Sequence, residues 1–255
     1  MVQAPIEMSA HMGGAWAWTY LSIAGVIASF VLMTLRTIRT RQILWLVLIP
    51  ASAICFFLEP FGDVIGLTWY PADSPWIIGT WMGRPMPAYL LFTYTAYFSL
   101  GFYGCYSYLV KSPSVAAIAR LWVITTLVNC SLEMTFLQMG VYVYYGNNPS
   151  KILGLPLYSM IQNGGAVILG GLLLMWAERT LRGWRSLWLI PAVPGMFVAY
   201  AVAGTWPVYV ALNSAAEGIW IWLPIAWAVV VCIAIPIAVM RSREFGIPAF
   251  QPEAQ

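Results

Sequence analysis

The stretch EGIWIWLPIAWAVVVCIAIPIAVM covers residues 217–240 and is followed by Arg241 and Arg243. After its first residue it contains no charged side chain, and a helix needs roughly 20 apolar residues to cross the hydrocarbon core of a bilayer. Long apolar runs without strict alternation are typical of membrane helices rather than of barrel strands. Six further stretches of this kind occur. We therefore expect an all-α protein with a single bundle of seven transmembrane helices, over residues 16–35, 43–66, 88–110, 115–140, 157–178, 187–209 and 217–240.

The composition also points to a bilayer as the solvent of this chain. Of its 255 residues, 8% are charged and 61% are hydrophobic, and the mean hydropathy is +0.79. A typical soluble domain has about 25% charged residues, which cover its surface. These values exclude a cytosolic enzyme, a disordered chain and a nucleic-acid-binding module. We expect residues 1–240 to form the transmembrane domain and residues 241–255 to form a short cytoplasmic tail.

The positive charges predict the orientation of the helices. Only Arg84 and Lys151 fall on one side of the predicted bundle. By the positive-inside rule the opposite, cation-rich side is cytoplasmic, so we expect a cell-membrane protein with its N-terminus outside. The first 15 residues contain no Lys or Arg, so we expect the first span to be retained rather than cleaved as a signal peptide. The cations on the cytoplasmic side are Arg36, Arg39, Arg41, Lys111, Arg120, Arg179, Arg182, Arg185, Arg241 and Arg243.

The inventory of reactive side chains excludes several kinds of site. The single histidine, His11, lies before the first span, and the four cysteines fall in predicted spans without a C-x-x-C pair. We therefore expect no metal site, no cofactor and no disulfide. No nucleotide-binding glycine motif and no nucleophile elbow occur. The last span has no lysine for a retinal Schiff base, and no aspartate-rich motif is present that would bind a diphosphate through magnesium.

Four acidic residues are candidates for chemistry inside the bundle, because carboxyl groups are costly in a membrane. At about 1.5 Å per helical residue, Glu59 lies roughly 25 Å from the inner boundary and Glu133 roughly 20 Å. Glu217 opens the last span on the outer side, so we expect Glu59, Asp63, Glu133 and Glu217 to converge on a pocket lined by spans 2, 4 and 7. Structural roles stay open for each of them. Glu59 and Asp63 could face interfacial water, Glu133 could bond Asn129, and Glu217 fits a capping box with Ser214.

Two other acids are expected to have local roles. Glu178 lies four residues before Arg182, which predicts an ion pair on one helix face. Asp73 precedes Ser74-Pro75-Trp76, which predicts the start of a short interfacial helix.

A short internal repeat supports the pocket. Both Leu58-Glu59 and Leu132-Glu133 begin the pattern Leu-Glu-x6-Gly-φ-x-φ-Tyr, where φ is apolar, which ends at Tyr70 and Tyr144. The pattern predicts a duplicated unit of two helices with two glutamates at similar depth. Further along the chain, Gly164-Gly165 and Gly170-Gly171 predict close helix packing.

Aromatic side chains make up 15% of the chain, and many of them belong to an interfacial belt. Tyrosines nevertheless continue through the span at 88–110, deeper than a belt requires. Aromatic rings stabilise positive charge, and a carboxyl group in an apolar site can stay protonated and act as a general acid. This combination suits the carbocation cyclisation of a polyene. The residues expected to contact such a substrate are Trp69, Tyr70, Trp81, Tyr94, Tyr97, Asn129, Tyr144, Asn163, Trp206 and Trp220.

The segment Phe57-Leu58-Glu59-Pro60-Phe61-Gly62-Asp63, the seven predicted spans and the acid at the start of the last span resemble the integral-membrane terpene cyclases. These include fungal meroterpenoid cyclases and bacterial relatives, and membrane lycopene cyclases are more distant look-alikes. The resemblance implies protonation of an epoxide or an alkene, a carbocation cascade and a final deprotonation. It also implies that Glu59 and Glu217 are the essential acids, although family members often have aspartate at the second position.

Two other functions fit the same sequence. A small proton-coupled transporter or lipid-binding protein would use the acids to bind a proton or a cation. A membrane double-bond isomerase would use them as acid and base. The expected partners in the first interpretation are the lipid bilayer and a hydrophobic isoprenoid, with Glu59, Glu217, Glu133 and Asp63 as catalytic candidates.

Overall fold

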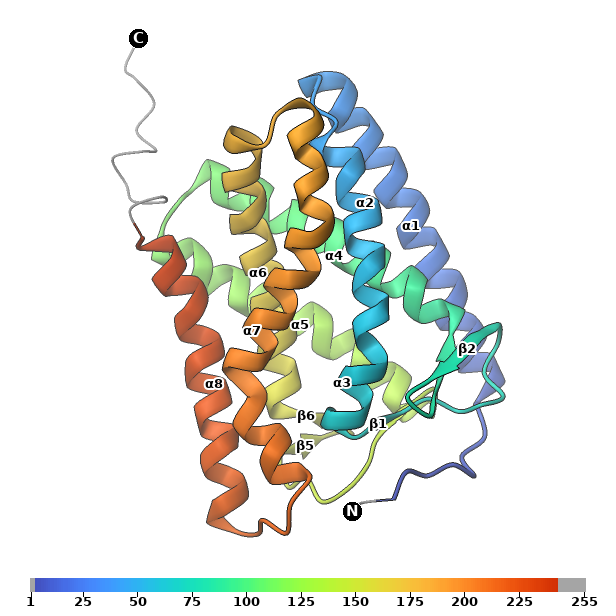
Figure 1. The fold of residues 1–255 in the computed structure, drawn as a ribbon. Coiled ribbons are helices and arrows are strands. Elements are labelled where there is room, and N and C mark those ends of the chain that lie inside the picture. Colours follow the sequence, from blue (N-terminus) through green and yellow to red (C-terminus); the bar gives the residue numbers. More distant parts are fainter. Residues whose placement is uncertain (1–2, 243–255) are drawn as a thin grey trace.

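The computed structural model describes residues 3–242 and is a helical bundle with three short two-stranded sheets (Figure 1). The helices are α1 (Met12–Thr40), α2 (Leu44–Ile54), α3 (Glu59–Gly66), α4 (Ala88–Lys111), α5 (Val115–Gln138), α6 (Leu157–Thr180), α7 (Leu189–Leu212) and α8 (Ile219–Met240). Two 3₁₀ turns are η1 (Cys55–Leu58) and η2 (Gly183–Trp188). The strands are β1 (Thr68–Trp69), β2 (Ile77–Trp81), β3 (Arg84–Pro87), β4 (Val143–Tyr144), β5 (Lys151–Ile152) and β6 (Leu155–Pro156).

Six helical segments in the described part of the chain are long and apolar enough to cross a membrane, as expected for a helical membrane protein. They are Met12–Thr40, Leu44–Gly66, Val115–Gln138, Leu157–Thr180, Gly183–Leu212 and Ile219–Met240. The remaining predicted span, at 88–110, forms α4, which has 24 residues but is less apolar because six tyrosines and Lys111 lie within it. Of the predicted tail at 241–255, the residues from 243 onward lie outside the described residues.

Helix α6 lies at the centre of the bundle and packs against α4, α5, α7 and α8. Most of its side chains are buried, whereas α1 exposes most of its apolar residues, as a helix that faces lipid does. The glycines of α6 allow this packing. A Cβ atom at Gly171 would lie 2.6 Å from Cys105 Cβ of α4, and one at Gly170 would overlap the ring of Phe102. The sequence prediction of close packing at these glycines is therefore confirmed.

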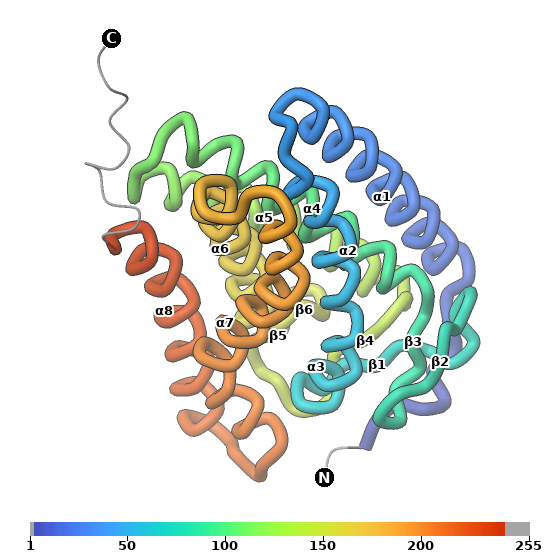
Figure 2. The backbone as a smooth tube through the Cα atoms, turned by 45° about the horizontal axis from the view of Figure 1, so that its top comes forward, coloured from blue at the N-terminus to red at the C-terminus, as the bar shows by residue number. Residues whose placement is uncertain are grey.

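The two ends of the bundle differ in structure (Figures 1 and 2). The α1–α2, α4–α5 and α6–α7 connections and the last turn of α8 lie at one end, which contains Arg36, Arg182 and most other cations. The short strands gather at the opposite end, where the described chain begins. The expected interfacial helix at Asp73 is wrong. Asp73 Oδ1 instead accepts a hydrogen bond from the backbone N–H of Ala10 at 2.8 Å, which ties the N-terminal segment to this loop.

The repeated sequence pattern corresponds to a repeated structure. After each glutamate helix the chain turns through a left-handed residue, Leu67 (φ 58°) or Gly140 (φ 69°), into a short strand. These two strands, β1 and β4, pair with each other, with Thr68 opposite Tyr144. Each unit then continues through a hairpin and a helix-capping proline, Pro87 or Pro156, into a helix of 24 residues. The sheet therefore joins the two units directly beside their glutamates.

Candidate active site inside the bundle

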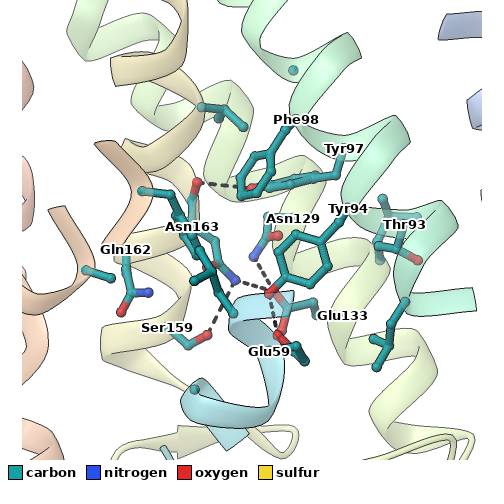
Figure 3. Close-up of a pocket in the computed structure, with 18 of the residues that line it drawn as sticks. Glu59, Thr93, Tyr94, Tyr97, Phe98, Asn129, Glu133, Ser159, Gln162 and Asn163 are labelled. Carbon is teal, nitrogen blue, oxygen red and sulfur yellow. Dashed lines mark hydrogen bonds between the residues drawn. The ribbon is translucent and has the colours of Figure 1, made fainter. Parts of the chain in front are cut away.

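A cavity of about 780 Å³ runs within the bundle from the strand-bearing end, where Glu59 and Thr68 line it, toward Tyr108 and Leu121 near the other end of α4 and α5. This size is ordinary for a small-molecule site, where pockets of roughly 300–1,000 Å³ are usual. Helices α1 and α3–α7 all contribute to its lining, which is largely apolar. The polar side chains that reach it are concentrated around two glutamates, Glu59 and Glu133 (Figure 3).

Glu59 lies at the first position of α3, where the chain changes from the 3₁₀ turn η1 to α-helix and Pro60 occupies the first turn. Tyr70 Oη donates to Glu59 Oε1 at 2.8 Å, and Tyr94 Oη donates to Glu59 Oε2. A tyrosine hydroxyl can donate or accept a hydrogen bond. The surroundings of Glu59 therefore accommodate both its charged and its protonated form.

Glu133 has a different set of partners, all of which donate to it. On Oε1 it accepts from the side-chain amides of Asn129 at 2.8 Å and Asn163 at 2.7 Å. On Oε2 it accepts from the hydroxyls of Tyr142 at 2.9 Å and Tyr144 at 3.3 Å. An amide NH₂ group cannot accept a hydrogen bond, so a proton on Oε1 would face two donors. The two amides therefore oppose a proton on Oε1, where Glu59 instead has a tyrosine hydroxyl that can accept.

The two glutamates are equivalent within the repeat. Each is bonded by the tyrosine eleven residues later, Tyr70 or Tyr144, which the adjoining strand presents. Each is also bonded by the residue seven positions after the helix-capping proline, which is Tyr94 in the first unit and Asn163 in the second. The backbone of Asn163 is itself bonded, because its main-chain carbonyl oxygen accepts a hydrogen bond from Tyr97 Oη at 3.0 Å (Figure 3). At this equivalent position the first unit has a tyrosine and the second has an asparagine, and this difference makes the surroundings of the two carboxyl groups chemically different.

The tyrosines on the two strands remain neutral donors. Burial, with the nearby carboxylates, raises the pKa of Tyr70, Tyr142 and Tyr144 well above its usual range. The rings of Tyr70 and Tyr142 are stacked with centroids 5.2 Å apart. The strands therefore deliver a rigid set of hydroxyl groups to both glutamates.

Asp63 lies one helical turn after Glu59 and also lines the cavity. It is 2% exposed, and its Oδ2 atom has no hydrogen-bond partner among the described residues. The buried guanidinium of Arg84 is near enough to interact with this carboxylate. Arg84 stacks over the rings of Trp69 and Tyr145, and its Nη2 donates to Tyr145 Oη at 2.6 Å. A fixed positive charge therefore lies beside the acids, on the side of the strands.

The structure brings together most of the residues predicted for the site. Three of the four acids line the cavity, namely Glu59, Asp63 and Glu133, and so do Tyr70, Tyr94, Tyr97, Asn129, Tyr144 and Asn163. Four predicted tryptophans do not. Trp69 packs under Arg84, Trp81 packs on Phe56 and Phe57, and Trp206 and Trp220 are 50% and 70% exposed on the outer surface of α7 and α8.

The prediction that Glu217 joins the other acids is wrong. Glu217 is exposed in the turn between α7 and α8 and lies outside the cavity lining. The capping box does not form either, because α8 begins at Ile219 after Gly218, and Ser214 Oγ instead accepts from the backbone N–H of Ala216 at 3.2 Å. The left-handed Gly218, with a φ of 53°, places this segment outside the helix.

Several residues of the site were not predicted. Tyr142 occupies a variable position of the repeat pattern, and Arg84 stands out in the sequence only as an exception to the distribution of cations. Gln162, by contrast, was expected from the sequence to line this space beside Asn163, and it accepts from Tyr209 Oη at 3.1 Å in the cavity wall. A second repeat signal, Pro87-Ala88-Tyr89 and Pro156-Leu157-Tyr158, would have aligned Tyr94 with Asn163.

Polar side chains join three helices at the end of the bundle opposite the strands. The predicted pair of Glu178 with Arg182 is replaced by a contact between helices, in which Arg36 Nη2 lies 3.4 Å from Glu178 Oε1. Tyr106 Oη donates to Glu178 at 2.5 Å, and the guanidinium of Arg36 lies over the ring of Trp45. Phe102 and Leu109 of α4 belong to the buried core.

No protein-family model, curated protein or solved structure matches this chain. A function is therefore inferred from the chemistry of the cavity.

Proposed function

We propose that this protein is a membrane-embedded terpene cyclase that protonates a linear isoprenoid, as an alkene or an epoxide, and guides the resulting carbocation into a ring. The observation that carries this proposal is the pair of buried glutamates with different hydrogen-bond partners in one aromatic-lined cavity. One glutamate can hold a proton, and the other is held as an anion. An initiating acid and a fixed negative charge are the two groups that a cationic cyclisation needs.

Glu59 is the initiating acid in this mechanism. Its O–H bond breaks, and the proton forms a new C–H bond at the terminal alkene, or an O–H bond at the epoxide oxygen. The π electrons of the next double bond close the ring and move the positive charge along the chain. Tyr94 remains bonded to Glu59 and stabilises the carboxylate that forms.

Glu133 and the aromatic rings stabilise the cation. Glu133 acts as an anion that keeps its charge through the reaction, stabilised by the amides of Asn129 and Asn163 on Oε1 and by the hydroxyls of Tyr142 and Tyr144 on Oε2. Tyr94, Phe98 and Phe197 form one aromatic cluster in the cavity wall, with centroids of Phe98 and Phe197 5.0 Å apart. Their faces attract positive charge, each by about 0.5–2 kcal/mol.

Asp63 completes the proton balance. Its unpartnered Oδ2 atom accepts the proton that the final cation releases when its C–H bond becomes a new double bond. Because Asp63 lies one turn from Glu59, the proton then returns to Glu59 and the reaction is a net isomerisation. Glu217 has no part in this mechanism.

We also propose the membrane placement of the site. All seven long helical segments cross the cell membrane in this arrangement, with α4 as the third span, the N-terminus outside and the cation-rich end cytoplasmic. Glu59 and Glu133 then lie in the outer half of the bilayer. An isoprenoid dissolved in the membrane can reach the cavity without entering water.

The test is to incubate membranes containing the protein with linear isoprenoids and their epoxides and to analyse the products by mass spectrometry. We expect cyclic products that disappear in Glu59→Gln and that fall strongly in Asp63→Asn. Glu178→Gln is the matched control, because Glu178 also bonds a tyrosine but lies outside the cavity. Absence of cyclic product with every chain length would refute the proposal, and a linear product with a shifted double bond would favour an isomerase.

A proton-coupled transporter is the second candidate, because the carboxyl groups lie where two repeated units meet, as they do in many transporters. Transport requires access from both ends, and at the end opposite the strands Arg36, Tyr106 and Glu178 bond one another across α1, α4 and α6. A transporter would have to open these contacts. Proton-coupled uptake of a solute into vesicles, lost in Glu133→Gln, would favour the transporter over the cyclase.

A further inference from the structure

The cavity continues past the glutamates as an apolar arm between α4 and α5. Nine lining residues of these two helices define this arm, and none of them is Asp, Glu, His, Lys or Arg: Leu100, Gly101, Gly104, Cys105, Tyr108, Leu121, Ile124, Thr125 and Val128. Leu121 precedes Glu133 by twelve residues on α5, which corresponds to roughly 18 Å along the helix. Gly104 follows Tyr94 by ten residues on α4, or roughly 15 Å. The arm is therefore long, narrow and parallel to the helices.

The arm is open on its side. Helices α4 and α5 are joined by only three residues, yet α5 packs mainly against α6 and contacts α4 little. Gly104 is exposed, and Ile124 and Val128 are 50% and 54% exposed. Each of these residues lines the cavity and also reaches the apolar outer surface. The cavity is thus continuous with the surface that lies at the depth of the lipid chains.

Gly104 is the residue that keeps this opening wide. A Cβ atom placed on it would meet no atom of the described residues within 4 Å, whereas a Cβ atom on Gly101, one turn away, would lie 2.8 Å from Val167 Cγ1. Gly104 is therefore not needed for helix packing. Alanine is preferred over glycine in a helix by about 1 kcal/mol, so helix stability does not explain a glycine here either.

We propose that the opening at Gly104 is the lateral entry for an isoprenoid from the bilayer, and that the arm holds the end of the chain remote from the reacting double bond. This inference rests on the proposed cyclase function for the identity of its occupant. The absence of Asp, Glu, His, Lys and Arg from the nine residues that line the arm fits a hydrocarbon chain, and the position of the acids at one end of the arm fits a reactive terminus there. The arm then determines how far the chain slides in, and so which double bond meets Glu59.

The experiment compares Gly104→Trp with Gly195→Trp. Gly195 is a matched control, because it is also an exposed helical glycine whose added Cβ atom would meet no described atom within 4 Å, but it lies outside the cavity. A tail-labelled photoreactive linear isoprenoid reports binding independently of turnover. We expect wild type and Gly195→Trp to be labelled on α4 and α5. We expect Gly104→Trp to lose this label and to lose roughly tenfold or more in kcat/KM, most of all for the longest substrates.

Three results would decide against the arm. The first is cyclisation by Gly104→Trp at the rate of Gly195→Trp. The second is loss of labelling in Val202→Trp but not in Gly104→Trp, which would place the entry beside α7, where Val202 also lines the cavity. The third is a phospholipid that co-purifies in the arm and is not displaced by the isoprenoid. A fourth result separates the two proposals. If the label on α4 and α5 depends on Gly104 but the protein forms no cyclic product, the arm binds the isoprenoid and the proposed cyclase function is wrong.

Discussion

Replacing Glu133 by glutamine changes one atom of the site and tests whether its negative charge is needed. Oε1 faces the amides of Asn129 and Asn163, which only donate, so the glutamine carbonyl must take that position. Its NH₂ group then faces Tyr142 and Tyr144, whose hydroxyls must reverse and accept. Tyr144 can donate instead to Ser159 Oγ, 3.2 Å away. Tyr142 has no second hydrogen-bond partner among the described residues.

The expected magnitudes follow from these bonds. A buried tyrosine hydroxyl without an acceptor costs about 1–3 kcal/mol. Removing a buried carboxylate recovers a desolvation penalty of several kcal/mol, so we expect the stability of Glu133→Gln to stay close to that of the wild type. Catalysis has no such offset, because the carbocation loses its fixed counter-charge. Removing one preorganised electrostatic partner from an active site lowers kcat by roughly 10²–10³, and we expect a loss of this size.

The assay is single-turnover formation of cyclic product by purified protein, with thermal unfolding in the same detergent as the measure of folding. Glu178→Gln serves as the control for the loss of a partly buried, tyrosine-bonded carboxylate away from the cavity. A folded Glu133→Gln variant with near wild-type kcat would show that no anion is needed at this position. The role assigned to the four donors would then be wrong.

Individual contacts lead to four further predictions. Tyr94→Phe should lower kcat roughly tenfold to a hundredfold with little change in KM. The variant loses the hydroxyl that stabilises Glu59 once Glu59 has given up its proton and become a carboxylate. An unchanged kcat in single-turnover kinetics would count against Glu59 as the acid. Glu217→Gln should leave product formation unchanged, because this side chain is exposed outside the cavity, and a large loss of activity would restore it as a candidate. The pKa of Tyr70, Tyr142 and Tyr144 is raised in the folded protein, so their contribution to stability is complete below the ordinary tyrosine value of 10.0 and is lost as the pH rises above it. Chemical unfolding between pH 8 and pH 12 should show this loss of stability, and the loss should be smaller in Tyr142→Phe. Gly171→Ala should destabilise the protein by about 1–3 kcal/mol, because the added Cβ atom would lie 2.8 Å from the backbone nitrogen of Tyr106. Gly195→Ala should not destabilise the protein, because its added Cβ atom would meet no described atom within 4 Å. Thermal unfolding of the two variants is the measurement.

Local sequence patterns predicted the long helices, because long apolar runs between charges are visible in the sequence. Six of the seven predicted spans each correspond to one helix whose bounds lie within five residues of the prediction, whereas the span at 43–66 is divided into α2, η1 and α3. The repeat around Glu59 and Glu133 was also visible in the sequence. Each glutamate and its tyrosine are separated by the same eleven positions, and the structure joins them in the same way in both units.

The partners across the bundle could not be read from local patterns. Tyr94 bonds Glu59 from 35 positions away, and Asn163 bonds Glu133 from 30 positions away. Glu178 illustrates the same limit, because its predicted partner was one turn away whereas its actual partner, Arg36, is 142 positions earlier. Spacing along one helix predicts which residues share a face, but not which other helix that face meets.

Glu217 shows that a position at the end of a helix does not define a site. It immediately precedes α8 in the chain, but α8, all of which the structure describes, contributes no residue to the cavity lining. Hydropathy and charge specify which residues enter the membrane and at what depth, since the energy of burying an apolar or charged side chain depends on that residue alone. Which acids share a cavity depends instead on how the helices pack, and that is decided by close contacts such as those of Gly170 and Gly171 with α4, which form only when the whole bundle is assembled.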